Sequence, residues 1–248
     1  MRNILFRADS SSFIGTGHIM RDLVLAKQYK TENIIFAVRE LDGNINYKID
    51  EEGYNKLILQ TNDFEELDKI IKKLNIDLII IDHYEINYDF EKKLKESNPN
   101  SKIFVLDDTY EKHFCDILLN HNIYADKKKY QNRVPKNCEL RCGAKYTLLR
   151  DEFLEAKKAK KRVKKKNKTI FLGLGGADHK NLNIKILKVV EKFKKSLKVN
   201  LVTTTANKNL EELKEYCKDK QWINLQINSN EVAKLISKSD FSIVTPSV

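Results

Sequence analysis

The sequence predicts an α/β protein with two doubly wound parallel sheets. Short apolar runs alternate with segments whose apolar residues recur at helical spacing, which is the pattern of repeated strand–helix units. A long basic run interrupts this pattern, which then starts again, and each block opens with a strand followed by a glycine-rich turn. Ligands of such sheets bind at the carboxyl ends of the strands, so we expect the active site in a cleft between two facing domains.

The first block alternates strands with helices. Residues 77–81 (DLIII) form an unbroken apolar run, as expected of a buried parallel strand, and residues 64–74 place their apolar side chains on one helical face. The other strands predicted are 3–6, 33–38, 56–60, 102–106 and 116–119, and the other helices are 17–29 and 88–97. We expect the stretch from residue 120 to about residue 150 to be mainly loop.

A basic run separates the two blocks. Residues 155–168 hold nine Lys or Arg and one Glu, in a chain with 46 Lys+Arg against 35 Asp+Glu. The run has no aromatic residues on which bases could stack and neither Gly nor Pro, so it indicates a solvated helical connection rather than a nucleic-acid site. We therefore predict a first domain over 1–152, a basic helical linker over 153–168 and a second domain over 169–248.

The second block repeats the strand–helix order. A strand over 169–172 leads into the turn GLGGAD and a helix predicted over 181–197. The remaining strands predicted are 198–202, 222–227 and 241–244, and the remaining helices are 208–219 and 230–237. A domain of about 80 residues is near the size at which a single hydrophobic core is marginal.

Composition excludes several classes of protein. With 41% apolar and 33% charged residues the chain is too apolar to be disordered, and no run of about 18 uncharged apolar residues could span a membrane. The N-terminus lacks the apolar core of a signal peptide, so we expect a cytoplasmic protein. Cys138 and Cys142 have neither a second pair nor a nearby His, which disfavours a zinc site and favours reduced thiols.

The first candidate motif is GTGHxxR at 15–21, just before a predicted helix. Glycines there let the backbone approach a ligand closely, and the helix N-terminus favours an anion. Met20 stands where the dinucleotide fingerprint requires a third glycine, so the motif is a different one. The helix dipole disfavours imidazolium, so we expect His18 to be neutral and able to accept a proton. A helix-capping histidine without chemistry is the alternative.

Two further motifs lie at strand ends. The turn GLGGAD at 173–178 lacks the G-K-[ST] ending of an ATPase P-loop, which favours backbone N–H groups presented to a diphosphate over a plain tight turn. Asp-His-Tyr at 82–84 and the Asp pair at 107–108 each follow an apolar strand, where sheet ligands bind, although Asp82 could also act only as a cap. Three other histidines are isolated in the sequence and are given no role: His113, His121 and His179.

Five segments of the sequence together resemble one enzyme family: RADSSSFIGTGHIMRDLVLAKQY, LIIIDHY, CDILLN, ELRCGAKYTLLRDEF and GLGGADHKNL. The chain is similar to the UDP-sugar hydrolases of pseudaminic acid biosynthesis, which act on UDP-2,4-diacetamido-2,4,6-trideoxy-β-L-altropyranose. The likeness runs through essentially the whole chain. That family resembles in turn the N-acetylglucosaminyltransferase of peptidoglycan synthesis, and both have the GT-B architecture of two Rossmann-like domains.

The resemblance implies hydrolysis of the bond between the anomeric carbon and UDP, with inversion and without a metal or cofactor. His18 matches the family's catalytic base, and Tyr84 of the Asp-His-Tyr motif would lie beside it and the sugar. The substrate-binding residues that it implies are Thr16, Gly17, Arg21 and Asp82, Arg150 at a phosphate, Gly175, Gly176, Ala177 and Asp178 at the nucleotide, and Ile227 at uracil. UDP is a stabilised leaving group, so one base without the paired carboxylates of ordinary glycosidases suits this reaction.

The family continues beyond the position of Val248 through an Asn-Glu pair, a final strand and helices. The resemblance therefore implies that residues 169–248 are an incomplete second domain. The expected partners are the UDP-sugar and UDP, with no membrane and no nucleic acid. Three alternatives stay open: a GT-B glycosyltransferase with the same donor site, a non-catalytic sugar-nucleotide-binding protein and a nucleic-acid binder.

Overall fold

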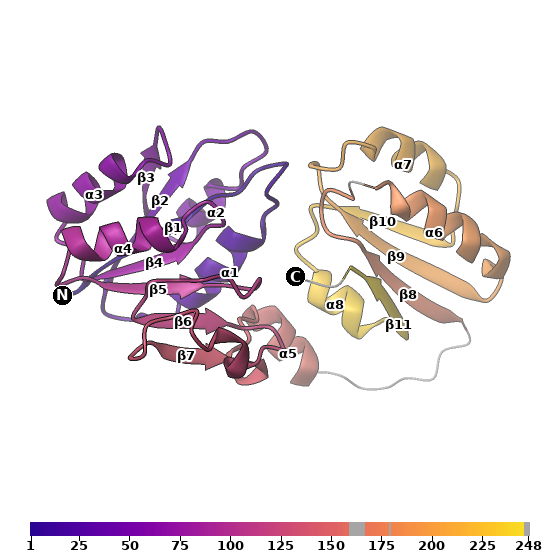
Figure 1. Ribbon diagram of the computed structural model, residues 1–248. Coiled ribbons are helices and arrows are strands. Elements are labelled where there is room, and N and C mark those ends of the chain that lie inside the picture. The colour runs from indigo at the N-terminus through magenta and orange to yellow at the C-terminus, as the bar shows by residue number, and fades with distance from the viewer. Residues whose placement is uncertain (159–166, 179, 246–248) are drawn as a thin grey trace. The chain divides into compact units, whose positions relative to one another are not determined.

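The computed structural model describes residues 1–158, 167–178 and 180–245, which form two compact units (Figure 1). We call residues 1–148 the N-unit and residues 149–247 the C-unit. The N-unit holds a seven-stranded sheet in the order β3-β2-β1-β4-β5-β6-β7, and the C-unit holds a four-stranded sheet in the order β10-β9-β8-β11. All neighbouring strands in both sheets are parallel, which confirms the two parallel sheets predicted from the sequence.

The N-unit closely follows the predicted order of elements. Its strands are β1 (Asn3–Ala8), β2 (Asn33–Arg39), β3 (Asn55–Leu59), β4 (Leu78–Asp82), β5 (Lys102–Leu106), β6 (Ile117–Asn120) and β7 (Glu139–Cys142). Its helices are α1 (Gly17–Ala26), α2 (Tyr47–Glu51), α3 (Phe64–Lys73) and α4 (Tyr88–Ser97), with short 3-10 turns at Lys127–Tyr130 and Ala144–Tyr146. The strand β7 lies in the stretch expected to be mainly loop, and α2 was not predicted.

Helices cover both faces of the N-unit sheet. Leu5 of β1 is fully buried in the core cluster that contains Leu67 of α3 and Leu94 of α4. The next residue, Phe6, belongs to the opposite cluster, with Ile19 of α1 among its members. Successive side chains of a strand point to opposite faces, so a strand with both faces covered is apolar at nearly every position. This explains the continuous apolar runs of the sequence.

The order of the strands reverses beside β1. The chain goes from β1 outward through β2 and β3, then returns to pair β4 with the other side of β1 and continues outward through β5, β6 and β7. At such a reversal the loops that leave the carboxyl ends of two neighbouring strands diverge and open a crevice for a ligand. The loop after β1 leads into α1, so the N-terminus of α1 lies at this edge of the sheet.

The C-unit is smaller. It consists of α5 (Asp151–Lys158), β8 (Lys168–Gly173), α6 (Leu182–Val190), β9 (Leu197–Thr203), α7 (Leu210–Cys217), β10 (Ile223–Ile227), α8 (Val232–Ser237) and β11 (Phe241–Val244). Its core contains Leu172 of β8, Leu187 of α6 and Leu213 of α7. The helix α5 packs against α8 within this unit, whereas residues 159–166 of the expected linker lie outside the described residues.

The helix α6 is shorter than predicted. It ends at Val190 and tightens into the 3-10 turn Glu191–Phe193, so the helix expected over 181–197 was too long. The tight turn is held by the bond from Lys194 N to the Glu191 carbonyl oxygen (3.1 Å), and Leu197 already pairs with Lys168 as the first residue of β9. Among the described helices, none combines the length and apolar character that a membrane span needs.

Candidate active site

Titratable side chains from distant parts of the sequence meet at the carboxyl edge of the N-unit sheet. Asp82 is the last residue of β4, Asp108 follows β5, and His121 follows β6. Because β4, β5 and β6 are neighbours in a parallel sheet, these three positions lie at the same edge. His18 and Arg21 reach them from the first two turns of α1.

The His18 imidazole is held by Asp82. Its Nδ1 lies 2.6 Å from Asp82 Oδ1, and both side chains are buried. An ionised carboxylate can only accept a hydrogen bond, so Nδ1 carries the hydrogen, and in the neutral imidazole Nε2 is then the nitrogen with a free lone pair. Burial opposes the ionisation of Asp82, but the Arg21 charge and the hydrogen bonds from Arg21 and His18 hold the pKa of Asp82 well below its usual range.

Arg21 binds two carboxylates at once. Its Nε and Nη2 donate to Asp82 Oδ2 and Oδ1, both at 2.5 Å, and its Nη1 donates to Asp108 Oδ2 at 2.9 Å. The same Nη1 lies 3.5 Å from His121 Nε2, which accepts because a guanidinium has no acceptor. Burial and the Arg21 charge lower the pKa of His121, so this ring is neutral at pH 7.

Tyr84 is the exposed member of this group. Its ring packs edge-on against the His18 ring, with 4.9 Å between centroids and 84° between planes, and 61% of the residue remains accessible. Its hydroxyl donates to Asp108 Oδ1 at 3.1 Å. Burial and the Asp108 charge raise the pKa of Tyr84 to about 12, so the phenol keeps its proton and acts as a donor.

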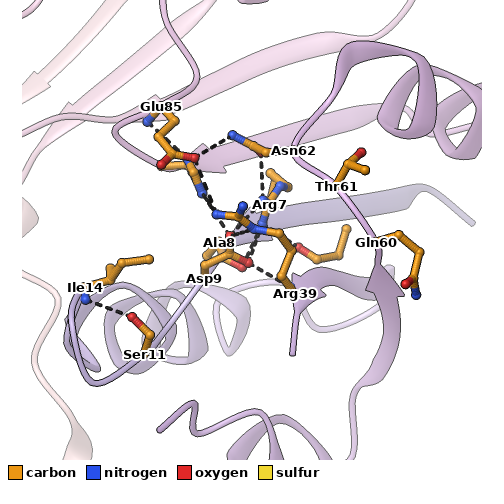
Figure 2. Close-up of polar contacts among 12 residues, drawn as sticks. Arg7, Ala8, Asp9, Ser11, Ile14, Arg39, Gln60, Thr61, Asn62 and Glu85 are labelled. Carbon is orange, nitrogen blue, oxygen red and sulfur yellow. Dashed lines mark hydrogen bonds and ion pairs between the residues drawn. The ribbon is translucent and has the colours of Figure 1, made fainter. Parts of the chain in front are cut away.

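His83 points to a second cluster, which consists of Arg7, Asp9, Arg39 and His83 (the Asp9 cluster). The carboxylate of Asp9 is fully buried and accepts five hydrogen bonds, from Arg7 Nη1 and Nη2 (2.7 and 2.9 Å), Arg39 N and Nε (2.8 and 2.7 Å) and His83 Nε2 (2.9 Å). Figure 2 shows Asp9 beside Arg7 and Arg39. Burial opposes its ionisation, but the bonds from His83 and Arg7 hold the pKa of Asp9 well below its usual range.

The Asp9 cluster ties several strand ends together. Arg7 Nη2 also donates to Asn62 Oδ1 at 2.8 Å, and Asn62 in turn donates to Glu85 Oε2 at 3.1 Å, as Figure 2 shows. Burial and the Arg7 charge lower the pKa of His83, which is therefore neutral. Consecutive residues of the Asp-His-Tyr motif thus serve different partners: Asp82 and Tyr84 line the His18 site, and His83 anchors the backbone between them.

The glycine-rich turn of the C-unit follows β8, as expected. Gly175 has φ +74°, which favours glycine, and the Gly176 carbonyl oxygen accepts bonds from the hydroxyls of Thr203 (3.2 Å) and Thr204 (3.1 Å). Asp178 is buried, and its carboxylate accepts the backbone N–H groups of Leu182 and Asn183, both at 2.9 Å. Asp178 therefore fixes the turn by capping the first turn of α6.

The other two C-unit candidates lie outside this turn. Ile227 is the last residue of β10, where it is half-buried. Arg150 immediately precedes α5, and its Nη1 lies 2.9 Å from Glu152 Oε1. In the described part of the chain, no group of three or more His, Cys, Asp or Glu side chains has an arrangement that could hold a metal ion.

A curated relative from Campylobacter jejuni is 41% identical to this chain over 244 residues, which are 98% of this chain and 85% of the relative. That relative is named UDP-2,4-diacetamido-2,4,6-trideoxy-beta-L-altropyranose hydrolase. This chain belongs to the same family of UDP-sugar hydrolases. It is an enzyme that acts on a nucleotide-linked sugar. The spore coat polysaccharide biosynthesis protein SpsG of Bacillus subtilis is 25% identical over 244 residues, which are 96% of this chain and 70% of SpsG.

Solved structures place this hydrolase in the GT-B fold class. Staphylococcus aureus MnaA with UDP gives a TM-score of 0.62 at 12% identity, covering 98% of this chain and 74% of MnaA. MurG of Acinetobacter baumannii gives a TM-score of 0.57 at 11% identity, covering 98% of this chain and 73% of MurG. At this level of identity the likeness establishes the fold alone. No protein-family model matches the sequence.

The predicted site residues fall into two sets, one in each unit. His18, Arg21, Asp82 and Tyr84 meet in the N-unit, with Thr16 and Gly17 at the start of α1. The candidates Arg150, Gly175, Gly176, Ala177, Asp178 and Ile227 belong to the C-unit. Asp108 belongs to the strand-end Asp pair that the sequence indicated, whereas two other N-unit residues at the site, Asp22 and His121, were not predicted.

Proposed function

We propose that this enzyme hydrolyses a UDP-linked 2,4-diacetamido-2,4,6-trideoxy-altropyranose to UDP and the free sugar, with inversion at the anomeric carbon and without a metal. The relative of 41% identity is named for this substrate, which supports the choice of sugar. The observation that carries the proposed mechanism is the 2.6 Å contact of His18 Nδ1 with Asp82, which leaves Nε2 as the acceptor. We assign the general base to this nitrogen.

The reaction needs a base because water is a weak nucleophile. His18 Nε2 takes one proton from water while the water oxygen forms a bond to the anomeric carbon. The bond from that carbon to the UDP oxygen breaks, and its electron pair leaves with UDP. Attack from the side opposite the leaving group inverts the configuration. A positioned base of this kind contributes about 10²–10⁴-fold to the rate.

Asp82 supports the base in two ways. Its carboxylate fixes the ring orientation and tautomer of His18, and its negative charge stabilises the imidazolium that forms when Nε2 takes the proton. Arg21 holds that carboxylate through two N–H groups, a geometry that limits rotation of Asp82. We therefore assign Arg21 to positioning, one step removed from the reacting water.

Tyr84 forms the proposed wall of the sugar site. Its phenol ring lies against the His18 ring and is 61% exposed, so it presents an aromatic face next to the base. With a pKa of about 12 its hydroxyl is a donor and not a base at neutral pH. The bond from this hydroxyl to Asp108 fixes the ring, which gives Tyr84 a defined orientation toward a bound sugar.

The leaving group is assigned to backbone donors. UDP departs as an anion, so N–H groups and positive charge stabilise it where a strong acid is not required. Thr16 precedes α1 without a side-chain cap, and a Cβ at Gly17 would meet no described heavy atom within 4 Å, so this turn is open to a diphosphate. In the C-unit we assign nucleotide binding to the turn at 175–177 and to the backbone of Ile227.

Two charged residues of the C-unit complete the proposal. Arg150 lies 2.9 Å from Glu152, a surface partner that a phosphate group could replace at little cost. Asp178 supports the turn from within, through its two bonds to backbone N–H groups of α6. The proposal therefore gives Arg150 a direct contact with phosphate and Asp178 an indirect one.

Nuclear magnetic resonance of the reaction tests the function directly. Proton and phosphorus spectra of the enzyme with the UDP-altro-sugar, in the presence of EDTA, should show UDP and a free sugar that first appears with inverted configuration. Retained configuration, or turnover that EDTA abolishes, would contradict the mechanism. Binding of UDP without any turnover would shift the assignment to a glycosyltransferase or a binding protein. Glucose linked to UDP serves as the matched control and should be hydrolysed far more slowly.

A further inference from the structure

Asp22 is a buried carboxyl group that the mechanism above leaves unused. It lies on α1, one helical turn after His18, and none of its surface is accessible. Neither of its side-chain oxygens has a hydrogen-bond donor among the described residues. Buried polar groups are almost always paired, so two orphaned oxygens on one carboxyl group require an explanation.

The charges around Asp22 favour its neutral form. Burial and the negative charge of Asp82 raise the pKa of Asp22 well above its usual range, and the Arg21 charge opposes this only in part. Asp82 shows the opposite behaviour, because Arg21 and His18 hold the pKa of that carboxyl well below its usual range. Two carboxyl groups within hydrogen-bonding reach of each other cannot both be ionised cheaply, and here the proton belongs on Asp22.

We propose that Asp22 is a neutral carboxylic acid whose O–H donates to Asp82, and that this bond makes Asp22 a positioning residue for the catalytic histidine. Its effect on the reaction rests on the proposed role of His18. A protonated carboxyl has the one donor that an ionised carboxylate lacks, so the proton gives one of the two orphaned oxygens a partner and leaves the other as an uncharged carbonyl oxygen. Asp82 then accepts from His18, Arg21 and Asp22 together.

The extra donor changes what Asp82 does to the base. Each hydrogen bond to the Asp82 carboxylate draws electron density from the oxygen that accepts His18 Nδ1–H, so the carboxylate stabilises imidazolium less. Asp22 thereby sets how strongly Asp82 holds the Nδ1–H of His18. Arg21 pairs with both Asp82 and Asp108, and the Tyr84 hydroxyl donates to Asp108.

Infrared spectroscopy of the whole enzyme tests the protonation state without any substrate. The spectrum at pH 7 should contain the carbonyl stretch of a protonated carboxylic acid, shifted in D2O. We expect Asp22→Asn to remove this band. Asp116→Asn is the matched control, because Asp116 pairs with Lys95 at 3.1 Å and should contribute no such band. Absence of the band from the wild-type spectrum, or its survival in Asp22→Asn, would overturn the proposal.

The pH profile of kcat/KM tests the effect on the base. Asp22→Asn is neutral and keeps a donor for Asp82, so the acid midpoint of the profile should move by less than about 0.3 pH unit. Asp22→Leu removes the donor, and the midpoint should rise by about half a pH unit or more. A fall of about one unit in Asp22→Asn would mean that Asp22 is ionised. If the wild type shows no turnover, the proposed function fails while the infrared result still decides the proton on Asp22.

Discussion

The two units bury different kinds of polar side chain. Among the described residues of the N-unit, the buried acidic and basic side chains are Arg7, Asp9, His18, Asp22, Asp82, Glu91, Asp107, Asp108 and His113. Among the described residues of the C-unit, Asp178 is the one buried charged side chain, and the other buried polar residues are Asn183, Thr203 and Asn207. Both sheets are parallel and both open with a glycine-rich turn, so the fold alone does not account for this difference.

The difference separates two tasks. Buried charges are costly unless they are paired, and a paired network holds its members in one orientation and shifts their proton affinities. The N-unit accordingly offers oriented acids and bases. The C-unit offers backbone groups and neutral amides and hydroxyls, which under the proposed function bind the nucleotide without changing their own protonation. Three substitutions test this difference between the units.

The largest effect is expected for His18→Asn. Loss of the base should lower kcat by about 10³-fold, whereas UDP affinity measured by titration should change by less than about threefold, because UDP is assigned to backbone donors. Asn retains an N–H donor for Asp82 and therefore preserves the packing around it. Activity within about tenfold of the wild type would remove His18 from the mechanism and return it to a structural role.

The next effect concerns stability and pH. Although burial opposes it, the nearby carboxylates of Asp107 and Glu91 raise the pKa of His113 to about 9. His113 Nδ1 lies 2.7 Å from Glu91 Oε1, and Nε2 lies 3.8 Å from Asp107 Oδ1. A histidine whose pKa is raised by folding stabilises the folded state. The stabilisation is complete below the unfolded-state pKa of about 6.5 and is lost as the pH rises through the folded-state pKa of about 9. We expect the difference in unfolding free energy between wild type and His113→Gln to fall by about 3 kcal/mol from pH 6 to pH 10.

Urea unfolding followed by circular dichroism at several pH values measures this difference. Glu111→Gln, a change at an exposed glutamate two positions away, serves as the control and should leave the pH dependence as it is. The single tryptophan, Trp222, lies in the C-unit, so its fluorescence reports on the unit that buries few charges. A difference between wild type and His113→Gln that does not vary with pH would contradict the charged state of His113.

The smallest effect is expected for Asp178→Ala. Loss of the two bonds that cap α6 should destabilise the C-unit by about 1 kcal/mol, seen as an earlier urea transition of Trp222 fluorescence. Asp178→Asn keeps one acceptor oxygen and should recover part of this loss. The substitution should leave kcat at saturating substrate nearly unchanged. A fall in kcat of more than a hundredfold would mean that a C-unit residue takes part in the chemical step, contrary to the difference described above.

Most of the fold follows from local patterns. The order of strands and helices was predictable because buried parallel strands are continuous apolar runs and their helices repeat at 3.6 residues. The strand β7 was not predicted because Glu139–Cys142 is a short, half-buried strand at the edge of the sheet, with charged and apolar residues mixed. The end of α6 was predicted too late because its apolar spacing continues past Val190. The chain leaves the helix there because Leu197 pairs with Lys168 of β8.

The site was predictable in part for the same reason. Glycine turns and strand-end polar residues indicated His18 and Asp82, but which strand ends become neighbours depends on the order of the sheet. Asp108 and His121 are 87 and 100 positions from Arg21, and nothing local joins them. A signal for Asp22 was present, because it lies four residues after His18 and so on the same face of α1.

The wide separation of these side chains in the sequence also bears on how the protein folds. The contacts of His18 and Arg21 with Asp82 join residues 64 and 61 positions apart, and they exist only when β4 has paired with β1. Closing such loops is entropically costly and precedes any gain from the contacts. Activity should therefore appear only when the central strands have paired. A chain that ends before residue 121 would lack part of the side-chain network around His18.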